Sequence, residues 1–272
     1  MQKIDLLLTN ILDTVINLVI CSAAILIPVL LFNLLQKVFI KGIKHRPIIL
    51  LRMLGMIAVP VHELSHAVMC ILFRHKIDKV VLFDITISNK ALGYVEHSYN
   101  PASPFQVIGC LFIGIAPIFG GILAVSLLTV GMLDNGYSFL IDLANAGSAL
   151  RIETPIDMLS LFSTSFDICY LQIGIALQID PVTAVTWMFL VGTIGLYLSP
   201  SYADLKGSFK GFLVLILGVI FTQWFTTQLD FTFIEGFLVP LSTILMMTLC
   251  LSLAIFFIAI TVSTIAYCVI DR

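Results

Sequence analysis

The residues of this chain best suited to chemistry are His62, Glu63 and His66, which form an H-E-x-x-H pentad. On a helix, this spacing places two imidazoles one turn apart on the same face, with a carboxylate beside them. Zinc readily takes imidazole ligands, and a catalytic zinc keeps one position open for water, whose pKa it lowers toward about 7. Glu63 can then take a proton from that water as general base. The pentad therefore predicts a zinc metalloprotease site.

The surroundings of the pentad are unusual for a soluble protease. It lies near the middle of an apolar run that covers about 48–73. Ionisable side chains inside a membrane are costly, so they are functional candidates by default. We therefore expect a protease whose active site lies within the bilayer.

A catalytic zinc needs a third protein ligand, and Asp204 is the first choice. It follows Ser199 and Pro200, and the proline predicts that a helix ends or bends there. A second interpretation makes Asp204 a first-turn acid of the next helix, with Ser201 as its cap. His97 is the rival third ligand.

The composition indicates an integral membrane protein. Of 272 residues, 60% are hydrophobic and 11% are charged, whereas soluble domains carry about a quarter charged residues. The formal net charge of -2 comes with no basic patch, so a nucleic-acid partner is not expected. The six cysteines are scattered singly and predict neither a disulfide framework nor a thiolate metal site.

The expected fold is an all-α polytopic membrane protein with about six transmembrane helices and a small β-hairpin after the pentad helix. A spanning helix needs about 20 apolar residues. Strand-like segments at 80–88 and 91–97, joined by a polar turn, predict the hairpin. We expect residues 155–178 to lie on or partly in the bilayer. The expected spans are approximately 14–36, 48–73, 105–132, 182–198, 209–226 and 237–269.

The loop charges give a partial orientation. The acidic stretch 134–181 is expected outside, and Lys206 and Lys210 favour the inside. This arrangement puts the hairpin inside. It also puts the basic residues of 37–46 outside, which violates the positive-inside rule.

The pentad within an apolar run, the hairpin after it, a span bearing glycine and proline, and a later span ending near Asp204 together resemble the site-2 protease family of intramembrane zinc metalloproteases. The resemblance implies that His62 and His66 are zinc ligands, Glu63 is the general base and Asp204 is the aspartate ligand. The family commonly has N-P-D-G or L-D-G at the aspartate, which Ser199–Asp204 lacks, so the chain resembles a divergent branch. The implied organisation is an N-terminal helix and basic loop (1–47), a protease core (48–210) and C-terminal helices (211–272).

The expected substrate is a transmembrane protein or peptide in the lipid bilayer, cut where its helix unwinds. Gly93, Tyr94 and Val95 form a hairpin edge that can hold such a segment as an added strand. Asn100 is a further substrate-binding candidate, although a turn role before Pro101 competes with it.

Two other functions stay open, namely an ion or proton pathway through the His, Glu and Asp side chains, and an inactive homologue that binds helices without cutting them. A prokaryotic plasma membrane is the expected location. The sequence leaves the oligomeric state open.

Overall fold

The structure is a computed structural model that describes residues 9, 12, 27, 29, 30, 33, 34, 37, 48–84, 92–149, 155–225 and 232–270. Within these residues the chain is mainly helical, with seven helices and one antiparallel sheet of two strands. The helices are α2 (Ile48–Leu72), α3 (Pro104–Met132), α4 (Gly136–Ala149), α5 (Pro155–Ile179), α6 (Pro181–Leu196), α7 (Tyr202–Phe225) and α8 (Thr232–Ile270), and the strands are β1 (Lys76–Val81) and β2 (Tyr94–Ser98). This arrangement agrees with the expected helical membrane fold.

Four of the described helices are long and apolar enough to cross a membrane, and they lie in α2, α3, α5 and α8. Long apolar helices suit lipid because every backbone N–H and C=O is bonded within the segment. The candidate spans are Arg52–Leu72, Pro104–Met132, Leu159–Ile179 and Pro240–Val262. The protein is therefore an integral membrane protein by length and composition of its helices.

The expected number of about six spans differs from the structure in two places. The predicted span 182–198 is the apolar helix α6, which has only 16 residues. Conversely, α5 contains the candidate span Leu159–Ile179, although we expected residues 155–178 only on or partly in the bilayer and did not count them as a span. The predicted span 209–226 falls in α7, and it stays a prediction because many side chains in the later part of α7 lie outside the described residues. The predicted first span, 14–36, lies almost entirely outside the described residues.

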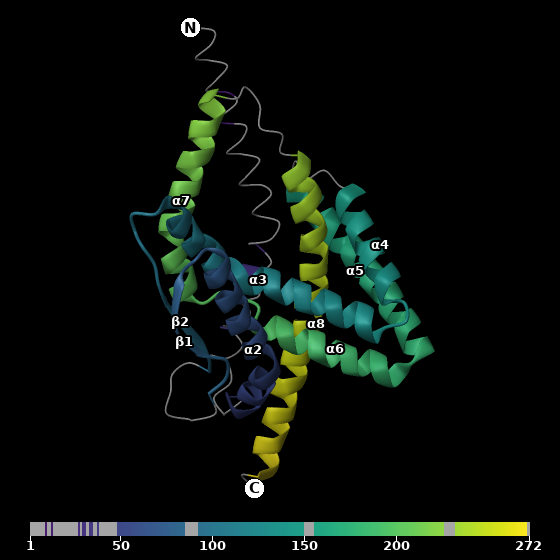
Figure 1. Ribbon diagram of the computed structural model, residues 1–272. Coiled ribbons are helices and arrows are strands. Elements are labelled where there is room, and N and C mark those ends of the chain that lie inside the picture. The colour runs from purple at the N-terminus through teal and green to yellow at the C-terminus, as the bar shows by residue number, and fades with distance from the viewer. Residues whose placement is uncertain are drawn as a thin grey trace.

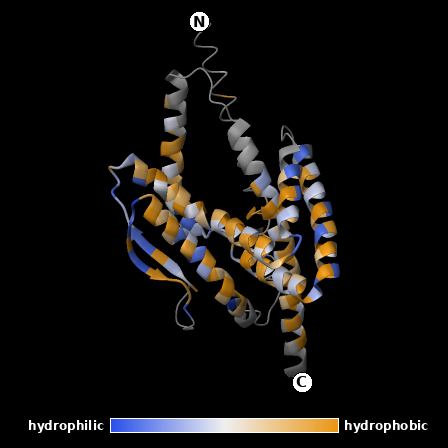
Figure 2. Cartoon of the chain, turned by 45° about the vertical axis from the view of Figure 1, so that its right-hand side comes forward, coloured by the Kyte–Doolittle hydropathy of each residue, from blue (hydrophilic) through white to orange (hydrophobic). Residues whose placement is uncertain are grey.

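The hairpin predicted after the pentad helix is present. β1 and β2 pair antiparallel, with Lys76 opposite Ser98 and Val81 opposite Tyr94, and an irregularity lies between Ile77 and Lys79. The first strand begins at residue 76, earlier than the predicted 80, and its predicted end and turn lie outside the described residues. Figure 1 shows the two strands beside α2, and Figure 2 shows that they are more hydrophilic than the helices around them.

Helix α3 runs through the middle of the molecule and packs against α2 and α7 near its beginning (Figure 1). On the other side of the molecule, α6 packs on α8, and α4 and α5 form a pair. The buried core there includes Trp187 and Phe139, whose rings lie 5.8 Å apart. The boundary expected at residue 210 falls inside α7, which continues to Phe225.

Candidate metal centre

The two histidines of the pentad lie on the same face of α2. His62 and His66 are one turn apart, and their Nε2 atoms approach to 3.2 Å. His66 is buried, at 6% exposure, and His62 is partly buried. The helix therefore places the Nε2 atoms of both imidazoles next to each other.

Backbone carbonyls hold both imidazole rings. His62 Nδ1 lies 2.6 Å from the carbonyl oxygen of Tyr197, and His66 Nδ1 lies 2.7 Å from that of Ile113. A carbonyl only accepts hydrogen bonds, so each Nδ1 carries the proton and donates it. Each Nε2 then presents its lone pair toward the other ring, which is the tautomer that a metal ligand needs.

Asp204 brings a carboxylate to the same point from α7. Its Oδ1 lies 3.6 Å from His66 Nε2, and its Oδ2 lies 3.8 Å from His62 Nε2. Ser201 N–H donates to Asp204 Oδ2 at 2.6 Å, and Asp204 N–H donates to Ser201 Oγ at 3.3 Å. Both interpretations of Asp204 from the sequence therefore hold. It lies beside the histidines, and it is an acid in the first turn of α7 that exchanges hydrogen bonds with Ser201.

The local chain path explains why Asp204 arrives there. Helix α6 ends at Leu196, and α7 begins at Tyr202. The connection between them contains Pro200, which cannot supply the N–H that a continuous helix requires. Tyr197 is the C-cap residue of α6, and its carbonyl oxygen accepts a hydrogen bond from His62 Nδ1.

Glu63 lies beside this cluster and is also buried, at 7% exposure. The segment before β2 crosses α2 at this point, because a Cβ added to Gly93 would lie 2.7 Å from Glu63 Cγ and from Val59 Cγ1. Only a glycine allows the chain to approach α2 so closely. Gly93 therefore packs directly against the side chain proposed as the base.

The three donor groups fit a divalent metal. One ligand atom from each of His62, His66 and Asp204 lies within 4.8 Å of the others. Bonds of 2.0–2.1 Å in a tetrahedral site separate neighbouring ligand atoms by about 3.4 Å. The two imidazole nitrogens lie 3.2 Å apart, and two different oxygens of Asp204 lie 3.6 Å from His66 and 3.8 Å from His62, so the closest approaches are near this value. Two imidazoles and one carboxylate also form a ligand set that zinc takes in catalytic sites.

His97, the rival third ligand, lies in a separate histidine pair. Its Nδ1 is 3.1 Å from Nδ1 of His75, and His75 Nε2 donates to the carbonyl oxygen of Gln106 at 2.8 Å. His75 Nδ1 is therefore the acceptor and His97 Nδ1 the donor. Burial and the nearby His75 lower the pKa of His97 below its ordinary value of 6.5.

The predicted substrate-binding residues are divided between two places. Tyr94 and Val95 lie on β2, where Lys79 Nζ stands 5.1 Å from the centre of the Tyr94 ring. Asn100 lies in the turn before α3, where its Oδ1 accepts from Ala102 N–H at 3.0 Å. The structure thus gives Asn100 a turn role.

Two parts of the site could not be found from residue types. The carbonyls of Tyr197 and Ile113 orient the histidines, but every residue has a carbonyl, so neither carries a sequence signal. Ser208 also carries no sequence signal for a place near the site. Its hydroxyl donates to the carbonyl oxygen of Asp204 at 2.6 Å and lies 3.3 Å from the carbonyl oxygen of Cys110.

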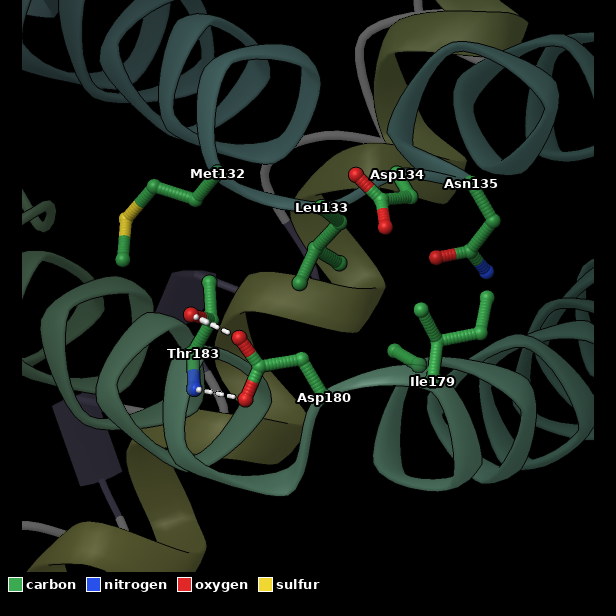
Figure 3. A pocket seen from close by; sticks show the side chains of 8 residues that line it. Met132, Leu133, Asp134, Asn135, Ile179, Asp180 and Thr183 are labelled. Carbon is green, nitrogen blue, oxygen red and sulfur yellow. Dashed lines mark hydrogen bonds between the residues drawn. The ribbon is translucent and has the colours of Figure 1, made fainter.

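A pocket of the molecule lies away from this cluster (Figure 3). It is lined by residues at the ends of α3 and α5 and at the start of α6, among them Asp134, Asn135 and Asp180. Asp180 Oδ1 accepts from the N–H groups of Val182 and Thr183, so it caps α6. The pocket contains none of the three clustered metal-ligand candidates.

Comparisons of this chain with protein-family models, with curated proteins and with solved structures found no match.

Proposed function

We propose that this protein is an intramembrane zinc metalloendopeptidase of the site-2 protease type, and that it acts on transmembrane segments of other proteins. The observation that carries the proposal is the approach of His62, His66 and Asp204 Oδ atoms to within 3.2–3.8 Å, beside a buried glutamate on a membrane helix. As a finer proposal, the membrane is the plasma membrane of a prokaryote.

In this proposal the three ligands hold one zinc ion, with His62 and His66 fixed by their Nδ1–H bonds. A zinc ion held there would act as a Lewis acid that polarises the scissile carbonyl and lowers the pKa of the attacking water. Glu63 would take a proton from that water as general base while the water oxygen bonds to the carbonyl carbon, and would return the proton to the amine as the C–N bond breaks. Burial of Glu63 keeps bulk water from competing for its hydrogen bonds.

The hairpin supports the proposal that the substrate binds as an extended strand. A helix shields its peptide bonds, so the segment to be cut must unwind, and its freed N–H and C=O groups then need partners. β1 and β2 form a sheet of two strands among the described residues, which leaves outer edges that can pair with an added strand. Gly93 directly precedes β2 and packs against Glu63, so the sheet lies beside the proposed base.

The test uses the full-length protein in lipid vesicles with a panel of single-span peptides. Each peptide carries a fluorophore and a quencher at its ends, and a glycine pair at a different depth. We expect wild type to cut at least one peptide, Glu63→Gln to lose about 100-fold or more of the rate, and both to bind equal amounts of zinc. Glu96→Gln, which changes an exposed hairpin glutamate, is the matched control and should cut normally.

Equal cleavage by wild type and Glu63→Gln would exclude the proposed base. If zinc-loaded wild type cuts no peptide, the same vesicles loaded with a pH-sensitive or zinc-sensitive dye distinguish the remaining functions. Ion flux that Glu63→Gln abolishes would favour a pathway, and the absence of flux would favour a helix-binding protein.

A further inference from the structure

Helix α5 carries a carboxylate in the middle of its candidate span. The span is Leu159–Ile179, and at a rise of 1.5 Å per residue Asp167 lies about 12 Å from one end and about 18 Å from the other. Asp167 is exposed. Helix α5 packs against α4, α6 and α8, whereas the metal-ligand candidates lie on α2 and α7.

Asp167 belongs to a row of residues that faces away from the protein core. Ser163, Asp167, Tyr170 and Gly174 follow one another at intervals of four, three and four residues, which is the spacing of one helix face. Tyr170 is 79% exposed, and a Cβ added to Gly174 would meet nothing within 4 Å. We call these four residues the α5 polar stripe.

The opposite face of α5 is the one that packs into the molecule. Its buried residues recur at helical spacing and are Leu161, Ser165, Cys169, Gln172 and Ala176. Only 28% of the α5 span is buried, compared with 44–56% for the other three candidate spans. Figure 2 shows hydrophilic residues among the hydrophobic ones along the helices of the α4–α5 pair. Within the described part of the chain, the stripe is therefore left uncovered by the protein itself.

Lipid alone is a poor neighbour for this stripe. A carboxylate in the hydrocarbon region needs a counter-ion or hydrogen-bond donors. Within the described part of the chain, Asp167 has no ion pair or hydrogen bond with another side chain. The serine, tyrosine and glycine beside it are suited to interhelical hydrogen bonds and close helix approach.

We propose that the α5 polar stripe docks a transmembrane helix of another protein that carries a lysine or arginine near its middle. The negative charge of Asp167 selects a positive partner, and Gly174 allows the partner backbone to come close. A second copy of this chain is a poor occupant, because a stripe-to-stripe contact brings two Asp167 carboxylates together. This inference is independent of the proposed proteolysis.

The experiment measures energy transfer between the labelled full-length protein and designed peptides in lipid vesicles. The peptides are 21-residue leucine-rich helices with a central Lys, Glu or Leu. We expect wild type to bind the Lys peptide about tenfold more tightly than the Leu peptide. Asp167→Leu should lose this preference, and Asp167→Lys should transfer it to the Glu peptide. Asp134→Leu, which removes an exposed acid outside the span, is the matched control and should bind like wild type.

Each variant is checked for folding by its thermal unfolding in detergent, so that a loss of binding is not a loss of structure. Equal affinity of wild type for the Lys and Leu peptides would overturn the proposal, and so would an unchanged preference in Asp167→Leu. The variant Tyr170→Cys tests self-association. If it forms disulfide-linked dimers to the same extent as wild type forms the peptide complex, the stripe binds a second copy of this chain instead. Loss of cleavage in Glu63→Gln leaves all of these outcomes unaffected.

Discussion

At the scale of single residues, the chemistry of the centre depends on hydrogen bonds made away from it. His62 and His66 each use Nδ1 on a backbone carbonyl, and this frees both Nε2 atoms to face Asp204. The pentad spacing predicted which residues share a helix face, since that is a property of the helix itself. The carbonyls that fix the tautomers come from residues 47 and 135 positions away in the chain, which no local pattern encodes.

A second polar contact at this scale is buried in the core. Trp187 Nε1–H donates to Thr129 Oγ1 at 3.1 Å, and both residues are fully buried. Thr129→Val keeps the shape of the side chain but leaves the indole N–H without an acceptor. We expect the free energy of unfolding to fall by about 1–2 kcal/mol, measured by thermal unfolding in detergent. Thr129→Ser keeps the acceptor and should be destabilised less, so equal losses in the two variants would show that the hydrogen bond is unimportant.

The histidine pair of the hairpin predicts a dependence on pH. Burial, together with His75, holds the pKa of His97 below its ordinary value of 6.5. The unfolded chain therefore binds a proton before the folded chain does, so the stability that neutral His97 contributes is present above pH 6.5 and declines as the pH falls through the folded pKa. NMR titration of labelled histidines should place His97 below 6.5, with His97→Gln identifying its signal. Titration at or above 6.5 would contradict the buried pair.

At the scale of helices and strands, α3 positions Asp204, the third metal-ligand candidate. A Cβ added to Gly114 would lie 2.5 Å from the carbonyl oxygen of Asp204, so α3 and α7 touch at the residue that completes the cluster. A glycine-bearing span was visible in the sequence, and close packing was one reading of it. Its partner was not visible, because the contact joins segments about 90 residues apart and depends on the angle between two helices.

Gly114→Ala tests this contact. The added methyl must push α7 outward and with it Asp204, so we expect zinc affinity to fall by about tenfold or more. Gly131→Ala is the matched control, because a Cβ there would meet nothing within 4 Å. Titration of the purified proteins with zinc against a competing chelator measures both affinities. A normal affinity in Gly114→Ala would show that α7 is not held by this approach.

The number of spans also illustrates what sequence patterns can and cannot predict. The apolar runs of α2, α3 and α8 were long enough to identify directly. Residues 155–178, which form most of α5, lie within the acidic stretch 134–181 and were expected on or partly in the bilayer, yet Leu159–Ile179 is a candidate span. Hydropathy alone does not distinguish a polar face that meets a partner from one that meets water.

At the scale of the whole molecule, the metal-ligand candidates and the largest part of the buried core lie on opposite sides of α3. On one side, α2 and α7 carry the histidines and Asp204, and the hairpin lies beside α2. On the other side, α4, α5, α6 and α8 contribute to the core around Trp187 (Figure 1). The two sides are connected, since the Tyr197 carbonyl at the end of α6 holds His62. Helices outside the cluster thus help to orient the side chains that could hold a metal ion.

The most direct test of this account is the amount of zinc bound per chain after purification in detergent. We predict about one zinc ion in wild type and in Glu63→Gln, and loss of zinc in both His62→Ala and Asp204→Ala. His97→Ala, which changes a histidine outside the cluster, should keep its zinc. Zinc retained by Asp204→Ala, or absent from folded wild type after zinc is added, would contradict a metal centre assembled from α2 and α7.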